Sequence, residues 1–387
     1  MKKLILSGIL ACLLAPVFAF TWNGVIDNTS KLSSNDDFSA LTLEQSNGVH
    51  FSLNAPFNTT GTLKFVAEGS FKYKLKTDFD ANTNNSMIAD LDLFKFAGKW
   101  TVGKGIIALD IGRFLISDIS GYTFSQKSDG LSLSYDALKF RVGAYAGYTG
   151  LQNRFNVTMT KNLQDDAKIY ALAAGYVPIM VNFTYKTLFE THTLGVQGEA
   201  FIPVVNIINE DKTMYFYGTL MMNGPLGVIG AYTLKGTVGL LDFKNLMVDG
   251  GLDLNFYIAN TAIMVIGGEF VSYESGSLHH FESITSRTTT LDPKFESEGG
   301  ILPKLSFVIA KNNVLTSFTG KGVIRMGDKT TFDGIDASAN LICNVFSDLQ
   351  VGLDLGAFVA IDSDVKEDIK KYESNVYYAT LKASLAF

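Results

Sequence analysis

"TLKFVAEGSFKYKLK", residues 62–76, alternates apolar and polar side chains along its length. One set of alternate positions carries Leu63, Phe65 and Phe71, and the other set is mainly charged. Successive side chains of a β-strand point to opposite faces, so this pattern predicts a strand with one apolar and one polar face. The run exceeds the roughly five to six residues of most soluble strands. It fits the roughly 9–11 residues with which a tilted strand crosses a bilayer.

The same alternation recurs along the chain. It is found in "LKFRVGAYAGY" (138–148), "GLDLNFYI" (251–258) and "VGLDLGAFVAID" (351–362). Counting such runs predicts about 18 strands, and 16 to 20 would be compatible with the pattern. Because no linker or change of composition divides the chain, we expect one all-β domain.

Connections in the second half of the chain are predicted to alternate in length. Short connections are expected at 223–225, 259–261, 311–313 and 347–348. Longer ones are expected at 240–245, 274–300, 327–336 and 363–374. Short turns at one end and long loops at the other are typical of an antiparallel up-and-down transmembrane β-barrel. A soluble sandwich or solenoid is the alternative, but a sandwich of this many long strands would be very large and no repeat is visible.

Composition limits the class of protein. Of the 387 residues, 47% are hydrophobic and 18% are charged, yet no internal segment approaches the roughly 18–20 continuous apolar residues of a membrane helix. The chain has 32 basic and 38 acidic residues, without a basic patch, so we expect no nucleic-acid partner.

The first nineteen residues have the layout of a secretory signal peptide. Lys2 and Lys3 precede an apolar stretch, and small residues lead to an expected cleavage after Ala19. Cys12 raises a lipoprotein alternative, which would leave an unusually apolar N-terminus. The mature domain would be residues 20–387, and its single thiol, Cys343, cannot form an internal disulfide.

The chain ends with "NVYYATLKASLAF" (375–387), in which apolar and polar positions again alternate. This ending resembles the C-terminal strand signature of bacterial outer-membrane β-barrels, with Tyr377, Leu381, Leu385 and Phe387 at the signature positions. The resemblance implies an outer-membrane location among its lipids and recognition by the barrel-insertion machinery. The last strand is expected to close the barrel against the first, near "FTWNGVID" (20–27).

A second resemblance covers residues 109–151, which contain "GRFLISDISGYTFSQKSDGLSLSY" (112–135). The segment is similar to one in alginate-export-type channels and in spirochaete porin-like barrels. The chain departs from alginate exporters because it lacks a dense ladder of Arg and Lys, so a uronate polymer is not implied.

If the apolar face meets lipid, the polar face must line a lumen. Charges of both signs there would orient water and select small hydrophilic solutes, or they would form static ion pairs along the wall. Arg113 is ambiguous, since its parity points outward unless Gly112 carries a bulge. The expected lining residues are Lys64, Glu68, Lys72, Lys74, Asp90, Asp92, Lys139, Arg141, Asp253, Asp354 and Lys382.

These patterns favour a porin-like channel for passive diffusion of small hydrophilic solutes or ions. One alternative is a surface-binding protein or adhesin that uses the 274–300 loop, with the barrel as its anchor. Another is a substrate-specific transporter, in particular one for a hydrophobic substrate, which would need a plug; residues 29–43 are polar and barely long enough to form one. The pattern fits a homotrimer as well as a monomer, because a face buried between barrels shows the same period of two.

Chemistry beyond transport is not expected. No Ser, His and Asp arrangement indicates an enzyme, and no cofactor is predicted. His279 and His280 lie near Glu274 and Glu282 in the longest loop, so a metal site is conceivable, but the spacing matches no helical zinc motif and we expect none.

Overall fold

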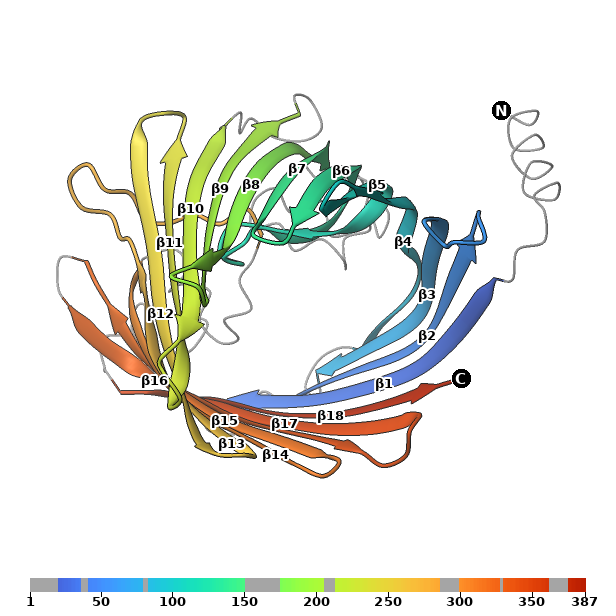
Figure 1. Ribbon diagram of the computed structural model, residues 1–387. Coiled ribbons are helices and arrows are strands. Elements are labelled where there is room, and N and C mark those ends of the chain that lie inside the picture. Colours follow the sequence, from blue (N-terminus) through green and yellow to red (C-terminus); the bar gives the residue numbers. More distant parts are fainter. Residues whose placement is uncertain are drawn as a thin grey trace.

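The computed structural model describes residues 20–35, 41–78, 83–149, 175–204, 213–285, 299–327, 330–361 and 375–387. In these residues, eighteen antiparallel strands form one sheet that closes on itself (Figure 1). Each strand pairs with its neighbours in the sequence, and β1 also pairs with β18. The all-β barrel and its strand number are therefore as predicted. The strands are β1 (Thr21–Asn35), β2 (Thr42–Pro56), β3 (Leu63–Asp78), β4 (Thr83–Val102), β5 (Gly105–Ser117), β6 (Ser125–Ala137), β7 (Phe140–Tyr148), β8 (Tyr176–Leu188), β9 (His192–Pro203), β10 (Tyr215–Pro225), β11 (Gly230–Leu241), β12 (Asn245–Ala259), β13 (Ala262–Val271), β14 (Gly300–Lys311), β15 (Val314–Arg325), β16 (Thr331–Asn344), β17 (Leu349–Ala360) and β18 (Val376–Ala386).

Closure occurs where sequence patterning placed it, between the first and last strands. Val25 lies opposite Ala386, and the N–H of Gly24 donates to the carbonyl of Phe387 at 2.8 Å. The Phe387 N–H returns a bond to the Gly24 carbonyl at 2.9 Å. The Phe387 ring makes edge contacts with Trp22 and Phe51. The last residue is thus paired and packed, and the closed sheet has no free edge. The predicted signal peptide, residues 1–19, lies outside the described residues.

The connections differ in several places from the sequence expectation. The short connection predicted at 223–225 is wrong, because these residues end β10 and the link to β11 is residues 226–229. β11 and β12 are joined by a tight link, Asp242–Lys244, in which Asp242 and Phe243 have positive φ, so the predicted long loop at 240–245 is wrong. β16 begins at Thr331, so most of the predicted loop at 327–336 is strand. Of the segment considered as a plug, 29–43, residues 29–35 belong to β1 and residues 42–43 to β2, and residues 36–40 lie outside the described residues. The predicted 363–374 loop lies outside the described residues.

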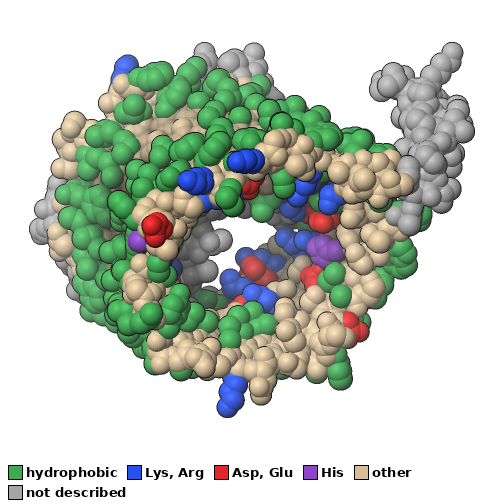
Figure 2. All heavy atoms as spheres, viewed as in Figure 1, with side chains coloured by type: hydrophobic (Ala, Val, Ile, Leu, Met, Phe, Trp, Pro, Cys, Tyr) green, Lys and Arg blue, Asp and Glu red, His purple; other side chains and the backbone are tan. Residues whose placement is uncertain are grey.

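Polar and apolar faces are reversed relative to a soluble barrel. In β9, Val196 is 45% exposed on the outer face, whereas Gln197 and Glu199 on the inner face are 2% and 5% exposed. Figure 2 shows hydrophobic side chains covering the outside, with charged side chains around a central opening. An apolar medium must therefore surround the barrel, as the hydrocarbon core of a bilayer does. Within the described part of the chain, no helix is long and apolar enough to cross a membrane.

One strand pair separates before its end. Pairing between β4 and β5 stops at Phe94 and Arg113, although β5 continues to Ser117. Gly112 has a φ of 128°, and a Cβ at this position would lie 2.1 Å from the Phe94 carbonyl oxygen. Arg113 then bonds to Asp129 of β6 through Nε and Nη2, at 2.9 and 2.8 Å. The ambiguous arginine is thus held by an ion pair where β5 leaves β4.

Candidate functional site

The connection between β5 and β6, residues 118–124, folds around one carboxylate. Asp118 accepts bonds from the backbone N–H groups of Ser120, Gly121, Thr123 and Phe124, at 2.9, 2.8, 3.3 and 3.0 Å. It also accepts a bond from the Ser120 hydroxyl. A buried carboxylate that satisfies this many donors fixes the conformation of a short segment.

This connection is tied to strands that are not neighbours of β5. The Ile119 N–H donates to Gln197 Oε1 of β9 at 3.1 Å, and the Thr123 hydroxyl donates to Glu199 Oε2 at 2.7 Å. Lys235 of β11 donates from Nζ to the Ser120 carbonyl at 2.7 Å. Because its partners are inward side chains of β9 and β11, the connection lies inside the barrel.

A second inward segment, residues 272–285, follows β13. Tyr217 of β10 donates its hydroxyl to the Glu282 carbonyl at 2.6 Å. The Ile284 N–H donates to the Thr123 carbonyl at 2.8 Å, and the Ser125 N–H donates to Thr285 Oγ1 at 2.8 Å. The two segments therefore bond to each other as well as to the wall. Residues 286–298 of the predicted long loop lie outside the described residues.

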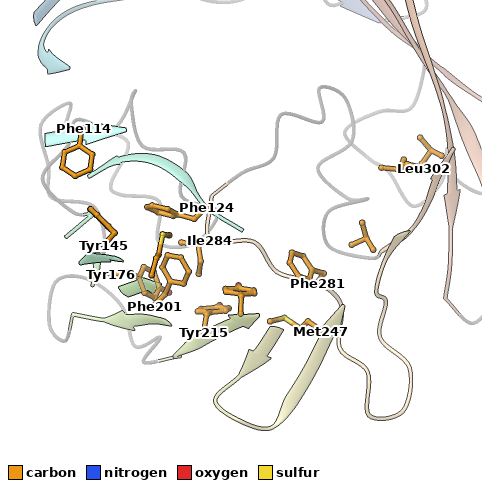
Figure 3. Close-up of a cluster of buried hydrophobic side chains, with 14 of the residues drawn as sticks. Phe114, Phe124, Tyr145, Tyr176, Phe201, Tyr215, Met247, Phe281, Ile284 and Leu302 are labelled. Atoms are coloured by element: carbon orange, nitrogen blue, oxygen red, sulfur yellow. The ribbon is translucent and has the colours of Figure 1, made fainter. Parts of the chain in front are cut away.

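An apolar cluster fills the space between these segments and the wall. In Figure 3, Phe124 and Ile284 from the two segments face Tyr176, Phe201 and Tyr215 from the strands. The Phe124 and Phe201 ring centroids are 5.2 Å apart. Apolar packing is the main stabilising contribution available to segments inside a water-filled barrel. The cluster therefore fixes both segments against one side of the lumen.

The wall formed by β1 to β4 is ionisable instead. A cavity of 730 Å³ lies over it, lined in part by Lys31, Glu44, Lys74 and Lys76. Lys76 and Glu44 form an ion pair of 3.3 Å, and both side chains are about half exposed. Such a pair contributes little to stability, about 0–1 kcal/mol, so these charges remain available to solutes. The lumen thus has one aromatic side and one charged side.

The structure brings several of the expected lining residues onto one face. Lys64, Glu68, Lys72 and Lys74 alternate along β3 with the outward Phe71, and Asp90 lies opposite Ser70 on the same inner face. Arg141 is exposed near the start of β7, on the same face as the buried Tyr145.

Two expected lining residues depart from the regular strand pattern. Lys139 lies in the turn between Ala137 and Phe140, so it is not part of the wall along a strand. Asp92 occupies a bulge, because Leu91 pairs with Gly69 and Leu93 pairs with Glu68. A bulge of one residue shifts the alternation on which the parity argument depends.

Asp92 and the remaining expected residues form ion pairs along the wall. Asp92 pairs with Lys127 of β6, and Lys382 pairs with Asp354 on the neighbouring strand. Asp253 reaches Lys304 at 2.6 Å across β13, where a Cβ on Gly267 would lie 2.1 Å from the Asp253 carboxylate. These pairs correspond to the static alternative that the sequence left open.

Sequence reasoning missed the residues that organise the interior. Asp118 and Gln197 were not singled out, nor was Lys304, which has the same alternation signal as its partner Asp253. Asp118 stands in "SDISGYTF" (117–124), a dense set of turn-forming residues that would have indicated a carboxylate-organised turn.

In the second segment, the hydrogen bond between Glu282 and His280 raises the pKa of His280 above its usual value.

A closed antiparallel barrel of eighteen strands, apolar outside and lined with ionisable groups, defines a porin-like membrane β-barrel. Solved outer-membrane porins share this fold. The chain is similar to Pseudomonas aeruginosa OccK7 (OpdD), with a TM-score of 0.63 and 12% identity, over 96% of this chain and 99% of that one. It is similar to Acinetobacter baumannii OccAB1, with a TM-score of 0.61 and 10% identity, over 95% and 96% of the two chains. It is also similar to Pseudomonas aeruginosa OccK5 (OpdH), with a TM-score of 0.57 and 12% identity, over 95% of this chain and 98% of that one.

At these identities the likeness establishes the fold. No protein-family model and no curated protein sequence matches the chain.

Proposed function

We propose that the protein is an outer-membrane channel through which small hydrophilic solutes or ions diffuse passively. The observation that carries this proposal is the asymmetric lumen, in which ionisable groups on β1 to β4 face a cavity of 730 Å³. A water-filled passage bordered by charges of both signs favours polar solutes over apolar ones. The fold of the similar porins supports the same function.

The two inward segments support a selective passage. They narrow the barrel from one side, and the bonds of Thr123 to Glu199 and of Tyr217 to Glu282 hold them to the wall. A fixed constriction beside a charged wall would sort solutes by size and charge, which is the property of a substrate-specific channel.

The adhesin alternative draws less support from the described part of the 274–300 loop. Residues 279–285 bond to the barrel wall and to the β5–β6 connection, so this part of the loop is engaged inside the barrel, whereas residues 274–277 are exposed. A binding surface would require side chains that face outward from the loop.

Export and insertion complete the proposal. Residues 1–19 would be removed on export, and Tyr377, Leu381, Leu385 and Phe387 would be recognised by the insertion machinery. Phe387 lies on the outer face beside Trp22 and Phe51, where a folding factor in the membrane could reach it before closure.

Planar-bilayer recording from the purified, detergent-folded protein tests the channel. We expect stepwise unit conductance from samples whose barrel fold is verified by heat-modifiable gel mobility. Folded protein that inserts into vesicles but gives no unit conductance would overturn the proposal.

A further inference from the structure

Four ionisable side chains meet at the beginning of the second inward segment. Glu274 Oε2 lies 2.6 Å from His279 Nδ1 and 3.6 Å from His280 Nδ1. On the other side of the two rings, Glu282 Oε1 lies 3.1 Å from His280 Nε2 and 3.7 Å from His279 Nε2. The imidazole centroids are 4.3 Å apart, so the rings lie side by side with a carboxylate at each edge.

The first edge has the chemistry of a divalent metal site. One ligand atom each from Glu274, His279 and His280 lies within 4.8 Å of the others. Ligands about 2.0–2.1 Å from a tetrahedral zinc ion are about 3.3 Å from one another. The distances of 2.6 and 3.6 Å from the Glu274 oxygen bracket this value. Two imidazoles and one carboxylate, with a position left for water, form a common zinc ligand set.

The second edge supplies an independent observation. A metal-bound imidazole keeps an N–H on its other nitrogen, and a carboxylate usually accepts it and thereby orients the ring. Glu282 Oε1 lies at that position for His280, 3.1 Å from its Nε2, and is 3.7 Å from Nε2 of His279. The Glu282 side chain accepts a bond from the Tyr215 hydroxyl at 2.8 Å, and its carbonyl accepts one from Tyr217 at 2.6 Å. Glu282 is thus anchored to the barrel wall.

We propose that Glu274, His279 and His280 bind a divalent transition metal ion, with zinc as the best match, and that Glu282 orients the His280 imidazole. The site lies next to the first residues of β12, because the His279 N–H donates to the Leu246 carbonyl at 2.7 Å. A metal ion there would join the exposed Glu274 to residues that are tied to the wall. It would stabilise the start of the inward segment whether or not the barrel conducts.

Zinc binding by the full-length, detergent-folded protein tests the site. After treatment with a chelator, calorimetric titration with zinc chloride should give one ion per chain. The double variant His279→Ala/His280→Ala should lose this binding. The matched control is His50→Gln, because His50 has a carboxylate partner, Asp27 at 2.5 Å, but no second imidazole beside it. The control should bind zinc as the wild type does.

Two carboxylate variants separate the roles. Glu274→Gln, at a side chain that is 68% exposed and should tolerate the change, would weaken zinc binding as a lost ligand. Glu282→Gln should weaken it about 10–100-fold as a lost orienting partner. No zinc uptake by the wild type, or equal uptake by the double variant, would overturn the site. Unchanged affinity in Glu282→Gln would overturn the orienting role.

A spectroscopic measurement covers the case in which the double variant does not fold. Copper(II) added to the wild-type protein in equimolar amount should show electron paramagnetic coupling to two imidazole nitrogens. Coupling to one nitrogen or none would refute the paired-histidine site. Because neither measurement uses conductance, failure here and failure of the channel proposal are distinguishable.

Discussion

Replacing Asp118 with alanine should loosen the folded β5–β6 connection, which its carboxylate organises, and raise the unit conductance. The carboxylate accepts bonds from the backbone N–H groups of Ser120, Gly121, Thr123 and Phe124. When the segment opens, these N–H donors bond to water instead. We therefore assign each lost bond about 1 kcal/mol, the value for a bond between neutral groups, although the acceptor is a carboxylate. Four bonds give about 4 kcal/mol, which changes the ratio of open to closed segments about a thousandfold.

The assay is single-channel recording of Asp118→Ala beside the wild type. We expect a larger unit conductance or new transitions between levels, since the remaining tethers from Ile119 and Thr123 hold only part of the segment. The matched control is Asp242→Ala, which removes a carboxylate that accepts one backbone bond, from Met214 at 2.8 Å, in another short connection. Identical conductance and noise in Asp118→Ala and the wild type would show that the connection does not limit the passage.

Three other changes test different parts of the molecule. Lys72→Glu with Lys74→Glu should shift the reversal potential in a salt gradient towards cation selectivity, and an unchanged potential would mean that these side chains do not border the conducting path. Phe387→Ala removes two edge-to-face ring contacts worth about 0.5–1.5 kcal/mol each. It should reduce insertion in vesicles that contain the insertion machinery, and wild-type yield would contradict its role as a signal. Gly112→Ala places a Cβ against the Phe94 carbonyl at a φ of 128°. The free energy of unfolding in urea should therefore fall by about 1–3 kcal/mol. The control change Ala144→Gly should not reproduce this loss.

The barrel itself was predictable because its signal is local. Alternation in β3, β12 and β17 depends only on which face meets lipid, so each strand carries its own signature. The terminal pattern through Phe387 likewise placed the closing pair with β1. Errors arose where a single residue changes the phase or length of an element, as at the Asp92 bulge and the tight Asp242–Lys244 link.

The interior was not predictable because its contacts join distant parts of the chain. Ser125 bonds to Thr285, 160 residues away, and Tyr217 bonds to Glu282, 65 residues away. A loop that folds into a water-filled barrel has the same polar composition as one that extends into solvent, so composition does not distinguish them. Only the aromatic residues Phe124 and Phe281 hint that part of each segment is packed.

The bonds between the two inward segments have a consequence for how the passage would respond to a solute. Thr123 and Ser125 are joined to Ile284 and Thr285, so neither segment can shift without straining the other. The two segments would then block and reopen the passage together. The durations of the closed intervals in current recordings should therefore follow a single exponential distribution instead of two.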